Sequence, residues 1–161
     1  MTQKLHSASP LRFVEHHLSR LSLEVAQKVD AEGVFGLKTN RKVTKDTKDP
    51  RRWRVEMEVE FGPGEPAKAT PYSGAITFTG TFEVAESYPV EKREDLVAVT
   101  GASILYGACR EMIANLTARA KYGLLSLPAI TLLKPEKKIE SDKATEASEA
   151  TPSIKSRRPK E

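Results

Sequence analysis

The sequence has little of what marks secreted, membrane-spanning or disulfide-bonded proteins. One cysteine, Cys109, is present among 161 residues, so no disulfide can form within the chain. No apolar run of about 18 residues is evident, and the N-terminal segment lacks an apolar core, so we expect neither a membrane span nor a signal peptide. From these absences we expect a cytoplasmic protein.

Candidate catalytic residues are equally scarce. His16 and His17 are adjacent on a predicted strand, so their side chains point to opposite faces and cannot bind one metal ion together. Cys109 lies on the apolar side of a predicted helix without a neighbouring histidine, which favours packing over nucleophilic chemistry. Three alternate glutamates between residues 56 and 60 have no histidine or aspartate partner on their strand face. We therefore predict that the chain is not an enzyme and needs no metal and no other cofactor.

What the sequence does contain is apolar alternation. It predicts four strands, over residues 11–27, 33–45, 52–61 and 73–85. The clearest is 52–61, where every second residue from Trp53 to Phe61 is apolar and the intervening ones are charged.

The first predicted strand has apolar residues of both parities. Leu21, Leu23 and Val25 share one face, whereas Val14 and Leu18 have the opposite parity. A strand of this kind is buried on both faces or is bulged between two partners.

Helical spacing of apolar residues replaces alternation after residue 100. Residues from Ile104 to Leu116 predict an amphipathic helix that begins at Thr100 or Ser103 and ends before Gly123. A short helix over 90–99 precedes it, and an extended apolar segment, 124–132, follows. Strands followed by helix predict an α+β fold, a four-stranded antiparallel sheet with one long and one short helix packed on one face.

The two ends of the chain differ from this pattern in composition. We expect residues 1–9 to be a flexible N-terminus, residues 10–133 to form the domain, and residues 134–161, rich in Lys, Glu, Ser and Pro, to be disordered and dispensable for folding.

One segment is strongly basic. Residues 38–54 carry eight Lys or Arg against Asp46 and Asp49, and they include Trp53. A nucleic-acid-binding patch is one interpretation. A solvated strand–turn–strand is the plainer one, so a nucleic-acid partner is not expected.

Residues 104–113, ILYGACREMI, resemble the SecB family of export chaperones. Arg119, the turn at residues 122–123 and the run Leu-Pro-Ala-Ile at 127–130 fall in the family's register. Residues 20–24 and 80–84 are weaker matches to its first and fourth strands. Gly107 replaces a proline of the family's helix, and Tyr-Gly replaces its Phe-Pro turn.

The resemblance implies an ATP-independent chaperone that holds non-native polypeptides, including preproteins for export, in apolar grooves. It implies a homotetramer built as a dimer of dimers. By strand facing and family position, the candidate groove residues are Phe35, Leu37, Trp53, Val55, Met57, Ile76, Phe78, Leu124, Leu125, Leu127, Ile130 and Leu132.

The resemblance also implies two protein interfaces. The candidate oligomer contacts are Val14, Leu18, Gly107 and Arg110. The candidate docking residues for the export motor SecA are Glu24, Glu56, Glu58 and Glu83. Arg20 and Ala75 replace acidic residues of the family, so we expect docking to SecA to be weak or absent.

In the family a second helix covers part of the sheet after the extended run. Here Pro135 and a lack of apolar residues interrupt residues 133–143, so we expect a half-covered apolar sheet face. Three alternatives to a general export chaperone stay open. They are a specialised chaperone for a dedicated client such as an antitoxin, a nucleic-acid-binding module using residues 38–54, and a plain oligomeric scaffold.

Overall fold

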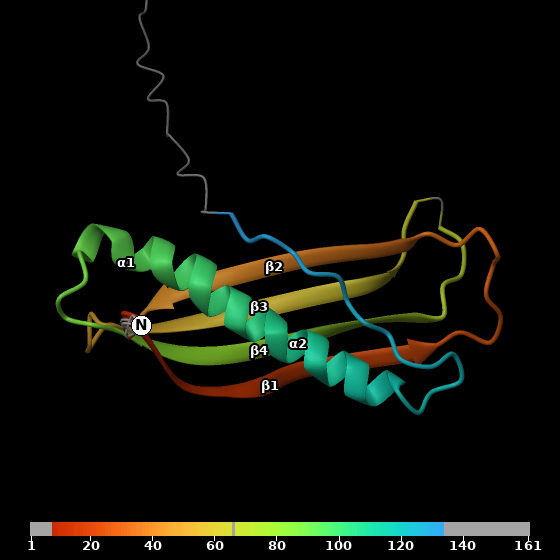
Figure 1. Cartoon of the computed structure of the whole chain (residues 1–161), viewed down its shortest axis with the longest axis horizontal. Coiled ribbons are helices and arrows are strands. Elements are labelled where there is room, and N and C mark those ends of the chain that lie inside the picture. The colour runs from red at the N-terminus through yellow and green to blue at the C-terminus, as the bar shows by residue number, and fades with distance from the viewer. Residues whose placement is uncertain (1–7, 66, 134–161) are drawn as a thin grey trace, which may run out of the picture.

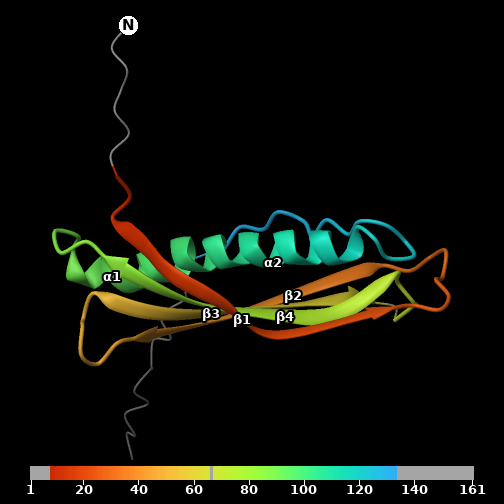
Figure 2. The ribbon, with the colours of Figure 1, turned by 90° about the horizontal axis from the view of Figure 1, so that it is seen from below.

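A four-stranded antiparallel sheet with one long helix across one face forms the protein (Figure 1). The computed structural model describes residues 8–65 and 67–133. Seen edge-on, the sheet and the helix make two layers (Figure 2). The α+β prediction is confirmed. The predictions made for residues 1–7 and for the tail 134–161, including the interrupted segment at 134–143, lie outside the described residues.

The strands are β1 (Leu11–Val25), β2 (Phe35–Lys45), β3 (Arg52–Pro63) and β4 (Tyr72–Val84). Their order in the sheet is β1-β4-β3-β2, so β1 and β2 are the two edges. The strand ends predicted from alternation lie within two residues of the observed ones, because β2, β3 and β4 each turn one parity of side chains toward the helix layer.

Two bulges in β1 explain its mixed parity. The register against β4 shifts between Phe13 and Glu15 and again between Leu18 and Arg20. Each shift inserts one unpaired residue and reverses which parity faces inward. Leu18 therefore faces the helix side together with Leu21, because their partners Phe78 and Ile76 do so. Of the two alternatives for this strand, the bulged one is confirmed.

The helix is continuous from Val90 to Thr117, as α1 (Val90–Leu96), a π-helical turn η1 (Val97–Gly101) and α2 (Ala102–Thr117). A helix start at Thr100 or Ser103 was therefore predicted wrongly. Ser103 instead donates its hydroxyl to the carbonyl of Val99, four residues earlier, inside the helix. Gly101 lies in the π-helical turn, where an added Cβ would come within 3.3 Å of the Phe82 ring.

By length and composition alone this helix could cross a membrane, which the search for an apolar run did not anticipate. Such a helix is weak evidence of a span, because the core helix of a globular fold has the same properties. Here 44% of its most apolar window is buried in the fold. We therefore interpret it as the core helix of this domain.

The core lies between the inner sheet face and the helix. Among its fully buried side chains are Phe82 and Met57 from the sheet and Leu105 and Ile113 from α2. Gly123, at φ +77°, has the left-handed conformation expected of it, although α2 ends at Thr117 and a turn separates the two.

Candidate functional site

The extended segment 124–133, which we call the strap, runs beside α2 on the helix side of the sheet toward β2 (Figures 1 and 2). Side chains hold its backbone. The Leu125 amide donates to Thr117 Oγ1 at 2.8 Å, and Arg110 Nε donates to the Leu127 carbonyl at 2.8 Å. The Tyr106 hydroxyl donates to the Pro128 carbonyl at 2.5 Å. These bonds satisfy backbone groups that would otherwise need a neighbouring strand.

Arg41 ties the end of the strap to β2. Its guanidinium donates to the carbonyl of Leu133 and, at 2.8 Å, to the carbonyl of Ala98 in the π-helical turn. One charged side chain thus joins β2, the helix and the strap. This role of Arg41 could not be predicted, because Arg41 is one of eight basic residues in the segment 38–54.

The strap covers much of the apolar sheet face. Its own Leu127 is fully buried in the core. Within the described residues this extended segment covers part of the sheet, and the region expected to lack a second helix, 134–143, lies outside them. Six candidate groove residues are packed core, at most 7% exposed. They are Trp53, Val55, Met57, Ile76, Phe78 and Leu127.

The other six candidates remain accessible. Phe35 and Leu37 on β2 are half-buried, as are Leu125, Ile130 and Leu132 on the strap, and Leu124 is 61% exposed. Half-buried Val43 extends the β2 group. We call these seven residues the strap–β2 surface, since Arg41 joins its two parts.

Two hollows border the strap–β2 surface. One, of about 540 Å³, lies where β2 begins and β3 ends, and its lining includes Leu37, Phe61 and Pro63. The other, of about 180 Å³, lies between α2 and the strap, and its lining includes Gly107, Ile130 and Leu132.

A second apolar surface, which we call the β1 surface, follows the other edge of the sheet. Leu18, Leu21 and Val25 on β1 are 39–40% exposed, and Ile104 and Leu116 on α2 are each 40% exposed. Phe13, 41% exposed, extends it, and its ring lies tilted against Phe82 with ring centroids 5.3 Å apart. A contiguous exposed apolar edge of this kind is typical of a protein interface.

The candidate oligomer contacts lie in different settings. Leu18 belongs to the β1 surface, and Val14 is the half-buried unpaired residue of the first bulge. Gly107 is exposed on α2, and a Cβ there would meet no described atom within 4 Å. No contact inside the described chain thus explains the glycine. Arg110 is engaged with the strap.

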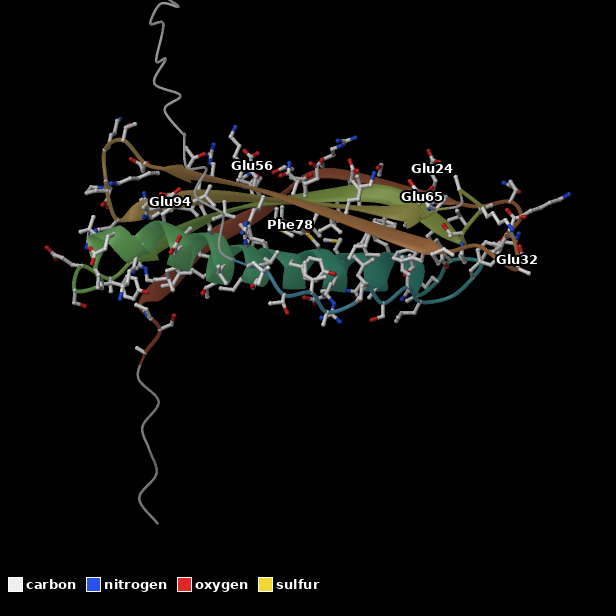
Figure 3. The ribbon with its side chains drawn as sticks, turned by 90° about the horizontal axis from the view of Figure 1, so that it is seen from above. Glu24, Glu32, Glu56, Glu65, Phe78 and Glu94 are labelled. Carbon is white, nitrogen blue, oxygen red and sulfur yellow. The ribbon has the colours of Figure 1, made fainter. Side chains whose placement is uncertain are left out.

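The face of the sheet away from the helix carries the candidate SecA-docking residues, and Glu24 and Glu56 project from it in Figure 3. Basic side chains oppose most of the acids on this face. Glu58 lies 3.5 Å from Arg20, and Glu83 pairs with Arg12 at 3.1 Å and Arg51 at 3.8 Å.

The same neutralisation extends toward β2. Glu56 stands directly across from Lys42, and Glu60 across from Lys38. Ala75, at a position that is acidic in the SecB family, is only 6% exposed. The outer face is therefore close to charge-balanced rather than acidic.

The basic segment offers no exposed aromatic side chain. Trp53 is 7% exposed, and the Lys45 ammonium lies 5.8 Å from the centroid of its ring. The indole Nε1 of Trp53 has no hydrogen-bond partner among the described residues. Base stacking on Trp53, on which the nucleic-acid alternative depended, is thus blocked in this fold.

The other titratable candidates are structural. Burial raises the pKa of the Cys109 thiol to about 12, so the thiol is neutral near pH 7. His16 pairs with Gly80 and His17 with Thr79 across β4, which puts them on opposite faces. Within residues 8–65 and 67–133, no cluster of three or more His, Cys, Asp or Glu could hold a metal ion.

Sequence reasoning missed the residues that hold the strap. Thr117 is fully buried in the apolar side of α2, and Tyr106 and Arg110 also interrupt that side. Polar groups at core-facing helical positions need partners. Their spacing along α2 was therefore an available signal that a backbone lies against this helix.

No family model and no curated protein matches the chain. Among solved structures, the fold is similar to the Mycobacterium tuberculosis SecB-like chaperone Rv1957, in complex with a ChAD peptide from the HigA1 antitoxin Rv1956. That match has a TM-score of 0.61 and 20% identity, and covers 76% of this chain and 91% of the other. A Streptococcus agalactiae protein of unknown function matches at a TM-score of 0.47 and 9% identity, covering 76% of this chain and all of the other.

The similarity to Rv1957 agrees with the sequence resemblance in residues 104–130, an independent line of argument. Both point to one architecture, a four-stranded antiparallel sheet with a long helix on one face. The chain has the SecB-like fold.

Proposed function

We propose that the protein is an ATP-independent SecB-like chaperone that binds non-native polypeptides and keeps them unfolded in the cytoplasm. The observation that carries the proposal is the strap–β2 surface, a set of accessible apolar side chains on a SecB-like fold. The peptide bound to Rv1957 supports a polypeptide as the ligand.

The energetics of such binding need no nucleotide. Each large apolar side chain of a client contributes roughly 1.5–3 kcal/mol when it is fully buried. Several half-buried subsites, such as those at Phe35, Leu37 and Ile130, can therefore hold a client through many weak contacts. Release requires only dilution of the unfolded client or its folding.

Aggregation of an unfolded protein, followed by light scattering without ATP, tests this function. We expect the wild-type protein to suppress aggregation at a stoichiometric ratio and Leu125→Asp to weaken suppression several-fold. Val29→Asp is the matched control, since Val29 is 39% exposed in the loop between β1 and β2, outside the strap–β2 surface. Equal activity of both variants would place the client elsewhere, and an inactive wild type would contradict the chaperone function.

The β1 surface fits a homo-oligomer. An exposed edge strand with apolar side chains is an aggregation hazard unless another chain covers it. We propose that β1 and α2 form the contacts of a dimer, and that open space at Gly107 admits a second helix in a dimer of dimers. The plain oligomeric scaffold shares this assembly but would not suppress aggregation.

The charges of the outer sheet face favour a chaperone for a dedicated client, such as an antitoxin, over one that delivers preproteins to SecA. The pairing of Glu58 with Arg20 and of Glu83 with Arg12 and Arg51 removes much of the negative potential that would steer a basic surface of the motor.

Calorimetry against SecA tests this preference. We expect little or no binding by the wild type and a gain of binding in Arg20→Asp, which frees Glu58 and adds an acid. Lys28→Asp is the control, because it changes the net charge equally in the loop after β1. Tight wild-type binding that Arg20→Asp leaves unchanged would favour the general export role.

A further inference from the structure

β2 is an edge strand of the sheet (Figure 1), and no described strand pairs with its outer side. The Asp46 amide donates to the Arg52 carbonyl, and the Gly64 amide donates to the Val34 carbonyl. Both bonds join even-numbered residues that lie in register with β2 and β3. Because hydrogen-bonded pairs alternate in antiparallel sheets, the odd-numbered residues of β2 direct their N–H and C=O groups to the open edge. No backbone bond joins them to another segment within the described residues.

The same odd-numbered residues face the helix side of the sheet. Phe35, Leu37 and Val43 are therefore half-buried beside these backbone groups, with Arg41 between them. An extended peptide added to the edge would lay every second side chain next to these apolar residues.

The two ends of β2 differ in character. The hollow at the first end, of about 540 Å³, is lined partly by Leu37, Phe61 and Pro63. Its charged lining residues are Lys38, Glu60 and Glu65, which leave no positive excess.

A hollow of about 400 Å³ lies at the last end, where β2 turns into β3. Its lining includes three basic residues, Lys45, Arg52 and Arg54, against Glu15 and Asp46.

The carboxylate of Asp46 is already engaged in the turn. It accepts the backbone N–H groups of Asp49 and Lys48, at 3.0 and 2.7 Å, and these bonds lower its pKa. The cations at this end thus exceed the acids that face them.

We infer that the β2 edge binds an extended segment of a partner polypeptide by strand addition. The segment is apolar at the end that lies against Leu37 and Phe61, and acidic at the end that lies against Lys45 and Arg54. This inference rests on the proposed chaperone function and adds a charge preference to it.

Three labelled peptides of 11 residues, the length of β2, test the charge preference. All three share one half in which every second residue is apolar. The other half carries Glu, Gln or Lys at every second position. Each of the three is made in two versions, with the apolar half first and with the apolar half last. By fluorescence anisotropy we expect the Glu peptide to bind at least roughly tenfold more tightly than the Lys peptide at low salt. The difference should shrink as salt rises.

A variant pair locates the preference. Arg54→Glu should reduce the Glu-over-Lys ratio at least threefold, since Arg54 is exposed and lines the basic hollow. Lys28→Glu, which changes the net charge equally at an exposed position outside both hollows, should leave the ratio unchanged.

N-methylation of the peptide tests strand addition itself. Methyl groups on one set of alternate amides should abolish binding, and on the other set should leave it intact, because only one set faces β2.

The outcomes separate the two proposals. Equal binding of the Glu and Lys peptides would mean that the basic residues only prevent aggregation through the β2 edge. That result would overturn the inference and leave the chaperone function standing. Equal tolerance of both methylation patterns would overturn strand addition. Failure of all peptides to bind, together with no suppression of aggregation, would contradict the proposed function.

Discussion

Replacing Leu18 and Leu21 together by aspartate is expected to convert the proposed oligomer into monomers of 17.8 kDa. Both side chains lie on the apolar β1 surface, about 40% exposed at the edge of the sheet. Apolar burial is the main driving force of association, and two carboxylates buried there would lack partners. Sedimentation should show wild-type protein at about four times the monomer mass, or at least twice, and the variant at one.

Two further variants test where the contacts lie. Gly107→Leu should separate dimers from tetramers, because a large side chain would fill the space left open on α2. Leu124→Asp, on the strap and 61% exposed, should leave the mass unchanged. A well-folded wild-type monomer at all concentrations would contradict the proposed assembly.

Phe82→Ala is expected to lower the free energy of unfolding by about 3–5 kcal/mol. Phe82 is fully buried, and a Cβ at either Gly80 or Gly101 would come within 3.4 Å of its ring. The backbone already lies close to this ring at both glycines. Because that backbone is held in the sheet and the helix, it cannot move far enough to fill the cavity left by the ring. Urea denaturation at a fixed protein concentration measures the change.

Phe35→Ala is the comparison for that measurement, because its ring is only half-buried at the β2 edge. It should cost much less stability than Phe82→Ala while reducing client binding. Similar losses from both substitutions would mean that the core does not centre on Phe82.

The regular strands were predictable because they bury one parity of side chains, as from Trp53 to Phe61 on β3. The bulges in β1 were predictable in kind, since apolar residues of both parities cannot lie on one face of a regular strand. The join of α1 to α2 was not predictable from local pattern. The π-helical turn that joins them accepts a hydrogen bond at the Ala98 carbonyl from Arg41, a residue distant in the sequence.

The candidate site was predicted only in part. The alternation pattern identified which apolar side chains share the inner face of the sheet, such as Met57 and Ile76. It could not show whether they line a groove or a core, because that depends on what covers the sheet. The cover is the strap, an extended segment that has no periodicity of its own. Its contacts with Thr117 and Arg110 bring together residues that are eight and seventeen positions apart.

Hydrogen exchange of the backbone amides, with and without a bound unfolded client, shows directly whether the client binds at β2. We expect client binding to slow exchange at β2, above all at the odd-numbered amides from Phe35 to Lys45, and to leave the even-numbered amides, already bonded to β3, unchanged. Protection confined to β1 or to the outer sheet face, with β2 exchanging as fast as in the free protein, would contradict this expectation.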